Sequence, residues 1–184
     1  MSSKKCEHVI DPDGTQRWYK DGIAHRTDGP AIIYSDGTQI WYKNGKYHRK
    51  DGPAIFWEDG NQEWYKNGKC HREDGPAVIY PSGYQVWYLN DKRHRKDGPA
   101  MISPEGDQEW YLNGQLHRDD GPAVIHSNGY QAWYLNDKRH RTNGPAIIKP
   151  DGTKEWWIND KNIEEIIKPQ IIINQLQFSI NDGF

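Results

Sequence analysis

The polar phrase His-Arg-x-Asp-Gly-Pro-Ala is the part of this sequence with the most evident chemistry. It begins at His25 and returns every 23 residues until His140, and only Asn143 departs from the Asp at its fourth position. Imidazole and guanidinium groups suit phosphate or carboxylate ligands, so the copies could form an anion-binding ladder along one edge. Its members are His25, Arg26, His48, Arg49, His71, Arg72, His94, Arg95, His117, Arg118, His140 and Arg141.

The same phrase has a structural interpretation, which we favour. Asp28 and its equivalents would cap a turn or pair with the Arg, while the His fills a half-buried position beside a Trp. Sameness among the copies does not separate the two interpretations, because packing needs identical residues as much as binding does. A function has to be argued from a site rather than from a motif.

Metal, cofactor and catalytic sites are not expected. Equivalent His residues would lie roughly 10 Å apart and point the same way, whereas zinc needs its ligand nitrogens about 2.1 Å from one centre. A catalytic set should occur once, in unlike surroundings. The unusual polar residues inside the repeats are scattered: Glu58, Ser103, His126 and Ser127. We therefore predict that the chain is not an enzyme and has no cofactor.

A Trp followed by an aromatic residue keeps the same 23-residue period, from Trp18 to Trp156. Alternation along a strand places Gln39 and Trp41 on one face and Ile40 and Tyr42 on the other. The residue before the Trp varies freely, which favours a solvated face, so we interpret Trp as the core aromatic and Tyr as the surface aromatic. The candidate contact surface comprises Tyr19, Tyr42, Tyr65, Tyr88, Tyr34, Trp57 and Tyr80.

The elements that must position these residues can be read from residues 37–59. Asn44-Gly45 predicts a tight hairpin turn, its flanks are rich in β-forming residues, and Asp59-Gly60 turns into the next copy. Copies stacked in the same sense require an even number of chain reversals. Asp51-Gly52-Pro53 is therefore interpreted as a bulge or corner within a longer strand, with its Gly at positive φ.

An unbroken period of this kind predicts an array of one small module. We expect an all-β fold, an elongated antiparallel β-meander or solenoid of about seven repeats, with 9 Trp and 11 Tyr supplying much of the buried surface. Residues 1–14 would form an N-terminal cap from a partial repeat, 15–162 the array and 163–184 a C-terminal cap. A homodimer through residues 171–184 is predicted, and deletion of that segment should abolish it.

Charge and hydropathy limit the partners. The 24 basic and 26 acidic residues are interspersed and leave a net charge of -2, so bulk nucleic-acid binding is not expected. The first residues lack the apolar core of a signal peptide, and no apolar run is long enough for a transmembrane segment. With only two cysteines, a reducing cytoplasmic location fits best.

The skeleton Trp41-x-x-x-Gly45-x-x-His48, with Gly52 and Gly60 following, resembles the MORN repeat. The resemblance covers about residues 8–162 in a variant form. The His-Arg tract is also similar to a repeat in uncharacterised proteins of phages and large DNA viruses, where the location would be the host cytoplasm. The MORN resemblance implies elongated β-sheets, scaffolding, self-association and attachment to phospholipid membranes. The last of these fits poorly with the net charge.

Two functions from different classes follow. The first is a non-enzymatic repeat scaffold that mediates protein–protein interaction or self-association. The alternative is a multivalent binder of anionic ligands, such as phospholipid headgroups or nucleotides, through the His-Arg ladder.

Overall fold

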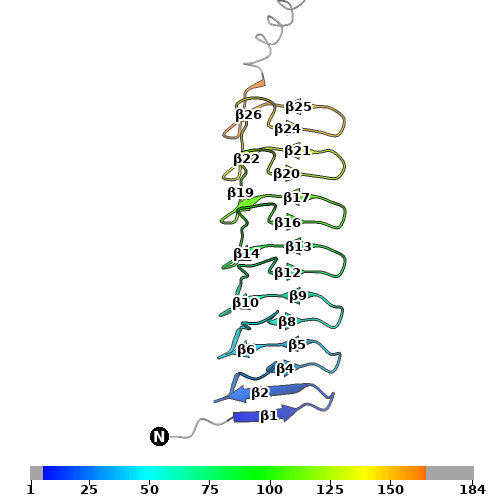
Figure 1. The fold of residues 1–184 in the computed structure, drawn as a ribbon, viewed down its shortest axis with the longest axis vertical. Coiled ribbons are helices and arrows are strands. Elements are labelled where there is room, and N and C mark those ends of the chain that lie inside the picture. The colour runs from blue at the N-terminus through cyan, green and yellow to red at the C-terminus, as the bar shows by residue number, and fades with distance from the viewer. Residues whose placement is uncertain (1–5, 165–184) are drawn as a thin grey trace, which may run out of the picture.

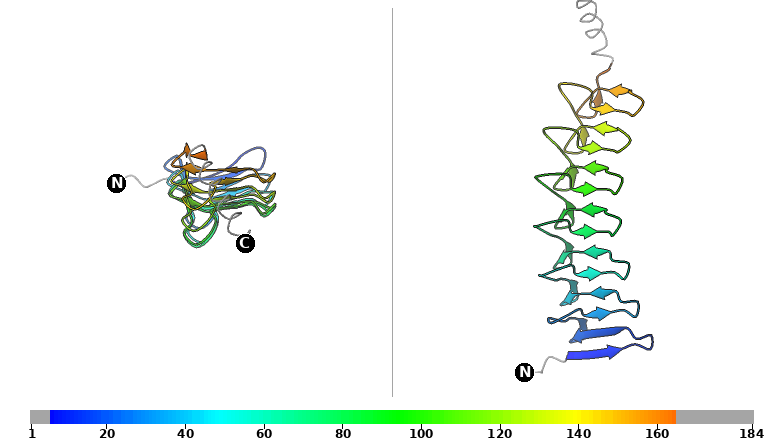
Figure 2. Two further views of the ribbon diagram at one scale, coloured as in Figure 1. Left: turned by 90° about the horizontal axis from the view of Figure 1, so that it is seen from above. Right: turned by 45° about the vertical axis from the view of Figure 1, so that its right-hand side comes forward.

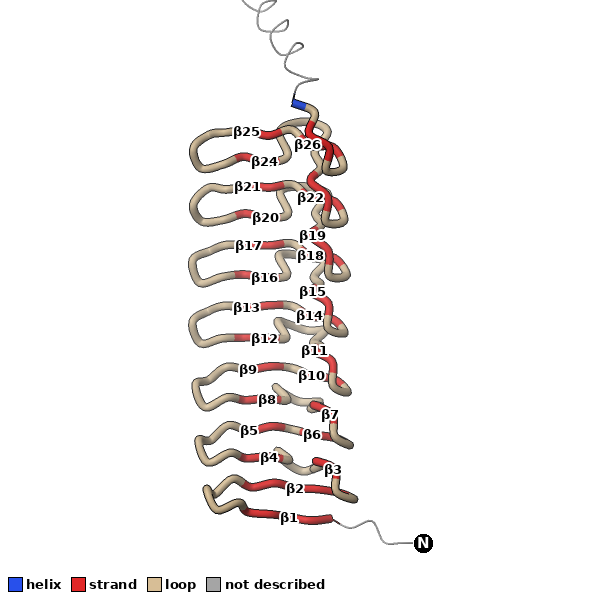
Figure 3. The backbone as a smooth tube through the Cα atoms, turned by 180° about the vertical axis from the view of Figure 1, so that it is seen from behind, coloured by secondary structure: helices blue, strands red, loops and turns tan. Residues whose placement is uncertain are grey.

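A computed structural model describes residues 6–164. Its main element is one long antiparallel β-sheet whose strands are stacked along the long axis of the molecule (Figure 1). A column of short hairpins runs beside this sheet along its whole length, as the view from behind shows (Figure 3). The predicted all-β, elongated repeat architecture is confirmed. No helix among these residues is long and apolar enough to cross a membrane.

Within residues 6–164, the strands of the main sheet lie side by side in the order of the chain. Its strands are β1 (Cys6–Ile10), β2 (Gln16–Lys20), β4 (Ile32–Ile33), β5 (Gln39–Ile40), β8 (Ile55–Phe56), β9 (Gln62–Glu63), β12 (Val78–Ile79), β13 (Gln85–Val86), β16 (Met101–Ile102), β17 (Gln108–Glu109), β20 (Val124–Ile125), β21 (Gln131–Ala132), β24 (Ile147–Ile148) and β25 (Lys154–Glu155), with β3 (Ile23–Ala24) paired to β2.

The hairpin column contributes one two-stranded unit per repeat. These units are β6 (Tyr42–Lys43) with β7 (Lys46–Tyr47), β10 (Tyr65–Lys66) with β11 (Lys69–Cys70), β14 (Tyr88–Leu89) with β15 (Lys92–Arg93), β18 (Tyr111–Leu112) with β19 (Gln115–Leu116), β22 (Tyr134–Leu135) with β23 (Lys138–Arg139), and β26 (Trp157–Ile158) with β27 (Lys161–Asn162).

Each repeat therefore makes an excursion between two strands of the main sheet. The chain leaves β5, passes through Trp41, forms the β6–β7 hairpin and returns to β8, which pairs antiparallel with β5. Asn44 and Gly45 have φ of 52° and 71°, the left-handed values that a two-residue hairpin turn requires. The turn prediction is confirmed, and each repeat contributes two strands to the main sheet.

Backbone hydrogen bonds tie each hairpin to the one before it. The amide of Arg26 donates to the Tyr42 carbonyl at 3.1 Å, and the amide of Gly45 donates to the Ala24 carbonyl at 2.9 Å. The two columns are thus continuous along the array, as the oblique view in Figure 2 illustrates. Since each repeat satisfies the backbone of its neighbour, stability is shared along the ladder.

The Asp-Gly-Pro tract differs from its prediction. It belongs to a return loop that carries the chain from the hairpin column back to the main sheet, rather than to a bulge within one strand. Within residues 6–164, none of the glycines of this tract has a positive φ, in contrast to the turn glycines such as Gly37 at 96°. Glycine is required here for a different reason, the close approach of an arginine described below.

The assignment of Trp to the core and Tyr to a solvated surface was wrong. Ala54 and its five equivalents are fully buried, and Ile40 and Ile55 are 5% and 4% exposed. Half-buried tyrosines pack against this aliphatic cluster, and the equally half-buried Trp41 and Trp64 are not part of it. The free variation of the position before Trp misled the prediction, because the tyrosines of the hairpin column cover that face of the sheet whatever residue it carries.

Candidate functional site in the return loops and the tyrosine face

The return loops hold their arginines by three kinds of contact. We define the return loops as residues 25–30, 48–53, 71–76, 94–99, 117–122 and 140–145. The Cζ atom of Arg49 lies 3.9 Å from the centre of the Trp41 ring, and the equivalent distances in the other five loops run from 3.9 to 4.2 Å. Such stacking is favourable by about 0.5–1 kcal/mol at exposed sites and more when desolvated.

A glycine of the same loop lies against each guanidinium. A Cβ added to Gly52 would be 3.0 Å from Cζ of Arg49, and the corresponding distances in the other loops are 2.9 or 3.0 Å. Few real Cβ atoms approach other atoms so closely, so an alanine would require the guanidinium to shift. This contact explains the fixed glycine of the Asp-Gly-Pro tract.

Each guanidinium also closes its own loop by hydrogen bonds. One terminal nitrogen donates to the carbonyl of the loop proline at 3.1–3.3 Å in all six loops. In four loops Nε donates to the Asp two residues later, and in the last loop to Asn143. In each of these four loops, the hydrogen bond from the arginine holds the pKa of the Asp carboxyl below its usual range. The Arg members of the predicted ladder are thus engaged within their own loops.

The histidines of the ladder join successive repeats. Nδ1 of His25 accepts from the amide of Asn44 at 3.0 Å, and four further histidines, up to His117, make the same bond to the next repeat. The last one, His140, has Nδ1 2.9 Å from Oδ1 of Asn159. Each histidine therefore fixes the hairpin turn that follows it.

Clefts open between successive return loops. Three consecutive ones have volumes of about 670, 600 and 870 Å³. Each is lined by a tryptophan of the later repeat, by the Arg of both loops and the His of the later loop, and by lysines and carboxylates; the first is also lined by the His of its earlier loop, His48. Ladder residues from neighbouring repeats are thus brought together in pairs.

The opposite kind of surface is the tyrosine face, which we define by the aromatic side chains packed on the aliphatic cluster and their equivalents. They are Tyr34, Tyr42, Tyr47, Trp57, Tyr65, Tyr80, Tyr84, Tyr88, Tyr111, Tyr130, Tyr134 and Trp157. Trp57 and Tyr80 are the most open, at 38% and 36% exposure. Burial raises the pKa of Tyr111 to about 12, with Glu109 adding to the rise.

Most of the predicted aromatic surface falls on this face, but it is wider than predicted. Tyr47 packs between Tyr42 and Tyr65, with ring centres 4.7 and 5.1 Å apart. Tyr84 lies 5.6 Å from Tyr80 across the turn that joins their strands. Sequence reasoning missed Tyr47 and Tyr84 because each occurs at a position that most repeats fill with other residues. Knowledge of which residues pair across the β6–β7 and β12–β13 hairpins would have placed both side chains on this face.

Charged residues on the tyrosine face alternate from repeat to repeat. Glu63, Glu109 and Glu155 occupy one position in every second repeat, with Val86 and Ala132 between them. Trp57 Nε1 and the Tyr65 hydroxyl both donate to Glu63, at 3.0 and 2.9 Å. The carboxylate of Glu63 is therefore hydrogen-bonded by aromatic side chains of this face.

Arginines between these repeats reach forward along the array. Arg93 donates to the Tyr111 hydroxyl at 3.0 Å and lies 3.7 Å from Glu109. Arg139 pairs with Asp160 at 2.8 Å. A shallow pocket of about 260 Å³ separates Glu63 from Arg93 and is lined mainly by Tyr80, Tyr84 and Tyr88.

No group of three His, Cys, Asp or Glu side chains between residues 6 and 164 is placed to hold a metal ion. The predicted dimer segment, 171–184, lies outside the described residues. No family model matches the chain, and a search of curated proteins finds no match. The MORN resemblance therefore stays a prediction.

Proposed function

We propose that the chain is a non-enzymatic repeat scaffold that binds a protein partner along its tyrosine face. The observation that carries the proposal is the exposure of Trp57 and Tyr80, at 38% and 36%, on a face whose composition changes between repeats. Aromatic residues are enriched where proteins bind one another. The return loops, by contrast, repeat one set of internal contacts.

The second candidate function, binding of anionic ligands through the whole ladder, rests on the clefts between the loops. It has less support, because each arginine stacks on a tryptophan and donates within its own loop. A cytoplasmic location, in the host cell if the source is viral, is part of the scaffold proposal. Attachment to phospholipid is not.

A crosslinked pull-down from native lysate tests the scaffold proposal. The bait variant Trp57→Ser/Tyr80→Ser should lose a stoichiometric partner that the unmodified chain captures. The matched control is Phe56→Ser, because Phe56 is 37% exposed beside Trp57 but points to the other face of its strand. A partner lost equally from both variants, or from neither, would contradict the proposal.

Further variants separate the two functions. If circular dichroism shows that the triple variant Arg49→Ala/Arg72→Ala/Arg95→Ala is folded, this variant should retain the protein partner bound at the tyrosine face. If a folded triple variant instead loses bound lipid or nucleotide, and no protein partner is found, the anionic-ligand function replaces the scaffold.

A further inference from the structure

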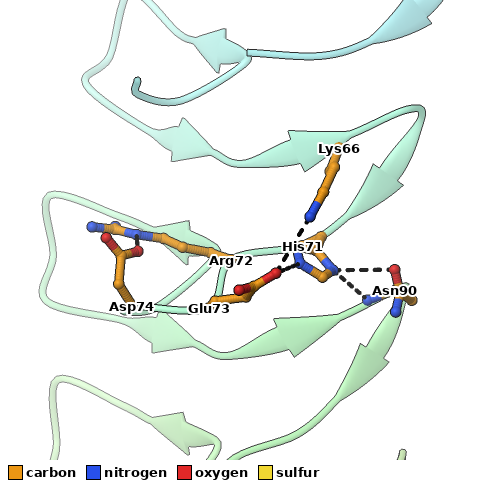
Figure 4. A network of polar contacts seen from close by, with 6 residues as sticks. All are labelled: Lys66, His71, Arg72, Glu73, Asp74 and Asn90. Carbon is orange, nitrogen blue, oxygen red and sulfur yellow. Dashed lines mark hydrogen bonds and ion pairs between the residues drawn. The ribbon is translucent and has the colours of Figure 1, made fainter. Parts of the chain in front are cut away.

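The third residue of each return loop decides whether its histidine has a carboxylate partner within the loop. That residue is Thr27, Lys50, Glu73, Lys96, Asp119 and Thr142 in turn. Where it is acidic, it binds the imidazole: Nε2 of His71 lies 3.0 Å from Glu73, and Nε2 of His117 lies 3.3 Å from Asp119. Figure 4 shows Lys66 and His71 converging on Glu73, with Asn90 beyond the other side of the ring.

The loop of His48 lacks this partner. Nδ1 of His48 accepts from the amide of Asn67 at 3.2 Å, so the proton of the neutral ring resides on Nε2. Nε2 is buried and is the single buried side-chain nitrogen or oxygen among residues 6–164 without a hydrogen-bond partner. A buried donor left unsatisfied is destabilising, and Lys50 cannot accept its proton.

The surroundings of His48 are cationic. Burial lowers the pKa of His48, and the charges of Lys43, Lys50 and Lys66 lower it further. His48 and Lys50 line the cleft of about 670 Å³ between the second and third return loops. The other end of that cleft holds His71 with Glu73. One cleft thus contains both a histidine with a carboxylate and a histidine without one.

We propose that the His48 end of this cleft binds a carboxylate from an acidic segment of a partner protein, in the position that Glu73 takes beside His71. The carboxylate would accept from Nε2 of His48 and pair with Lys50. A carboxylate is the ligand because Glu73 and Asp119 supply that group to the same ring nitrogen in two other repeats. Nε2 is closed to solvent, so a neighbouring side chain must shift, which is common at interfaces.

Exchange of residues between repeats gives the test. Lys50→Glu supplies the missing carboxylate from within and should close the site, while Glu73→Lys should open a second site at His71. Both residues already occur at this loop position, so the variants should fold. Lys154→Glu, which makes the same charge change on β25, is the control.

The measurement is the ring ¹H–¹⁵N NMR signal of each histidine during titration with an octaglutamate peptide. We expect His48 to shift in the unmodified chain, with affinity at least about tenfold weaker in Lys50→Glu and unchanged in Lys154→Glu. Glu73→Lys should add a shift at His71. Octaglutamine should shift neither ring.

Three results would overturn the proposal: no His48 shift with octaglutamate, an equal shift in Lys50→Glu, or a shift caused by inorganic phosphate alone. The proposal does not rest on the tyrosine face. Loss of binding in Lys50→Glu therefore stays distinct from any effect of the Trp57 and Tyr80 changes.

Discussion

The return loops and the tyrosine face differ in how much sequence variation between repeats their packing tolerates. Every return loop stacks an arginine on a tryptophan and closes with the same bond to a proline carbonyl. The tyrosine face carries Ile40 in one repeat and Glu63 in the next, each covered by tyrosines. The loop residues are the same in every repeat because their contacts require one close geometry. On the tyrosine face, the aromatic side chains cover the sheet and tolerate different residues beneath them.

This difference explains why repetition was a poor guide to function. The most regular residues of the chain have structural contacts: each Arg closes its own loop, and each His binds the hairpin turn of the next repeat. Less regular residues leave surface or polar groups available: Trp57 is 38% exposed, and Lys50 offers no acceptor to the unpartnered Nε2 of His48. Candidate contacts therefore arise where a repeat departs from its neighbours.

The largest expected effect comes from removing a loop arginine. Arg72→Ala loses the stack on Trp64 and leaves the Pro76 carbonyl unpaired, so we expect a loss of about 2–3 kcal/mol in unfolding free energy. Arg93→Ala, on the tyrosine face, removes a partly exposed pair and should cost less than about 1 kcal/mol. Urea unfolding measures both, and equal losses would remove the distinction between the two regions.

A smaller effect should follow from adding one methyl group to a loop. Gly75→Ala places its Cβ 3.0 Å from Cζ of Arg72 and should cost about 1–2 kcal/mol. Gly83 lies in open space at φ of +97°, so Gly83→Ala should cost about 1 kcal/mol through backbone strain.

A double-mutant cycle separates these causes. In an Arg72→Ala background the cost of Gly75→Ala should disappear, while that of Gly83→Ala should persist. Unchanged costs for both would mean that the guanidinium contact does not determine the glycine.

The smallest effect is a pH dependence confined to one loop. The pKa of His48 is lowered from its usual 6.5 by burial and by nearby lysines, so the native state binds fewer protons than the unfolded state. The contribution of His48 to the free energy of unfolding is fully present above about pH 6.5 and is lost as the pH falls through the lowered native pKa. Thermal unfolding between pH 7.5 and 5 should show a decline that His48→Gln reduces. A decline of the same size in that variant would assign it to other groups.

The loop carboxylates act in a separate window. The pKa of Asp74 is lowered by Arg72, so its contribution is present above its unfolded pKa of about 3.9 and is lost at lower pH. The contribution of Asp74 therefore begins to fall at a lower pH than that of His48, whose window begins at about pH 6.5.

Most of the fold could be predicted from the sequence, and much less of the candidate site. Trp41 and its equivalents fixed the period, and Asn44-Gly45 fixed the hairpin, because positive φ at two successive residues has few chemical solutions. The role of Gly52 could not be predicted, since nothing local indicates that Arg49 returns to lie against it. The unsatisfied Nε2 of His48 was equally hidden, because its Nδ1 partner, Asn67, lies in the next repeat.

The sequence by itself determined the repeat, the turns and the all-β class, which depend on residues close together in the chain. Only the tertiary structure decided which aromatic covers the core and which imidazole nitrogen is buried without a hydrogen-bond partner. Those outcomes depend on how Tyr47 and Asn67 meet residues of neighbouring repeats. The physical reason is that burial and hydrogen-bond satisfaction are set by contacts across repeats, and these exist only once the columns have stacked.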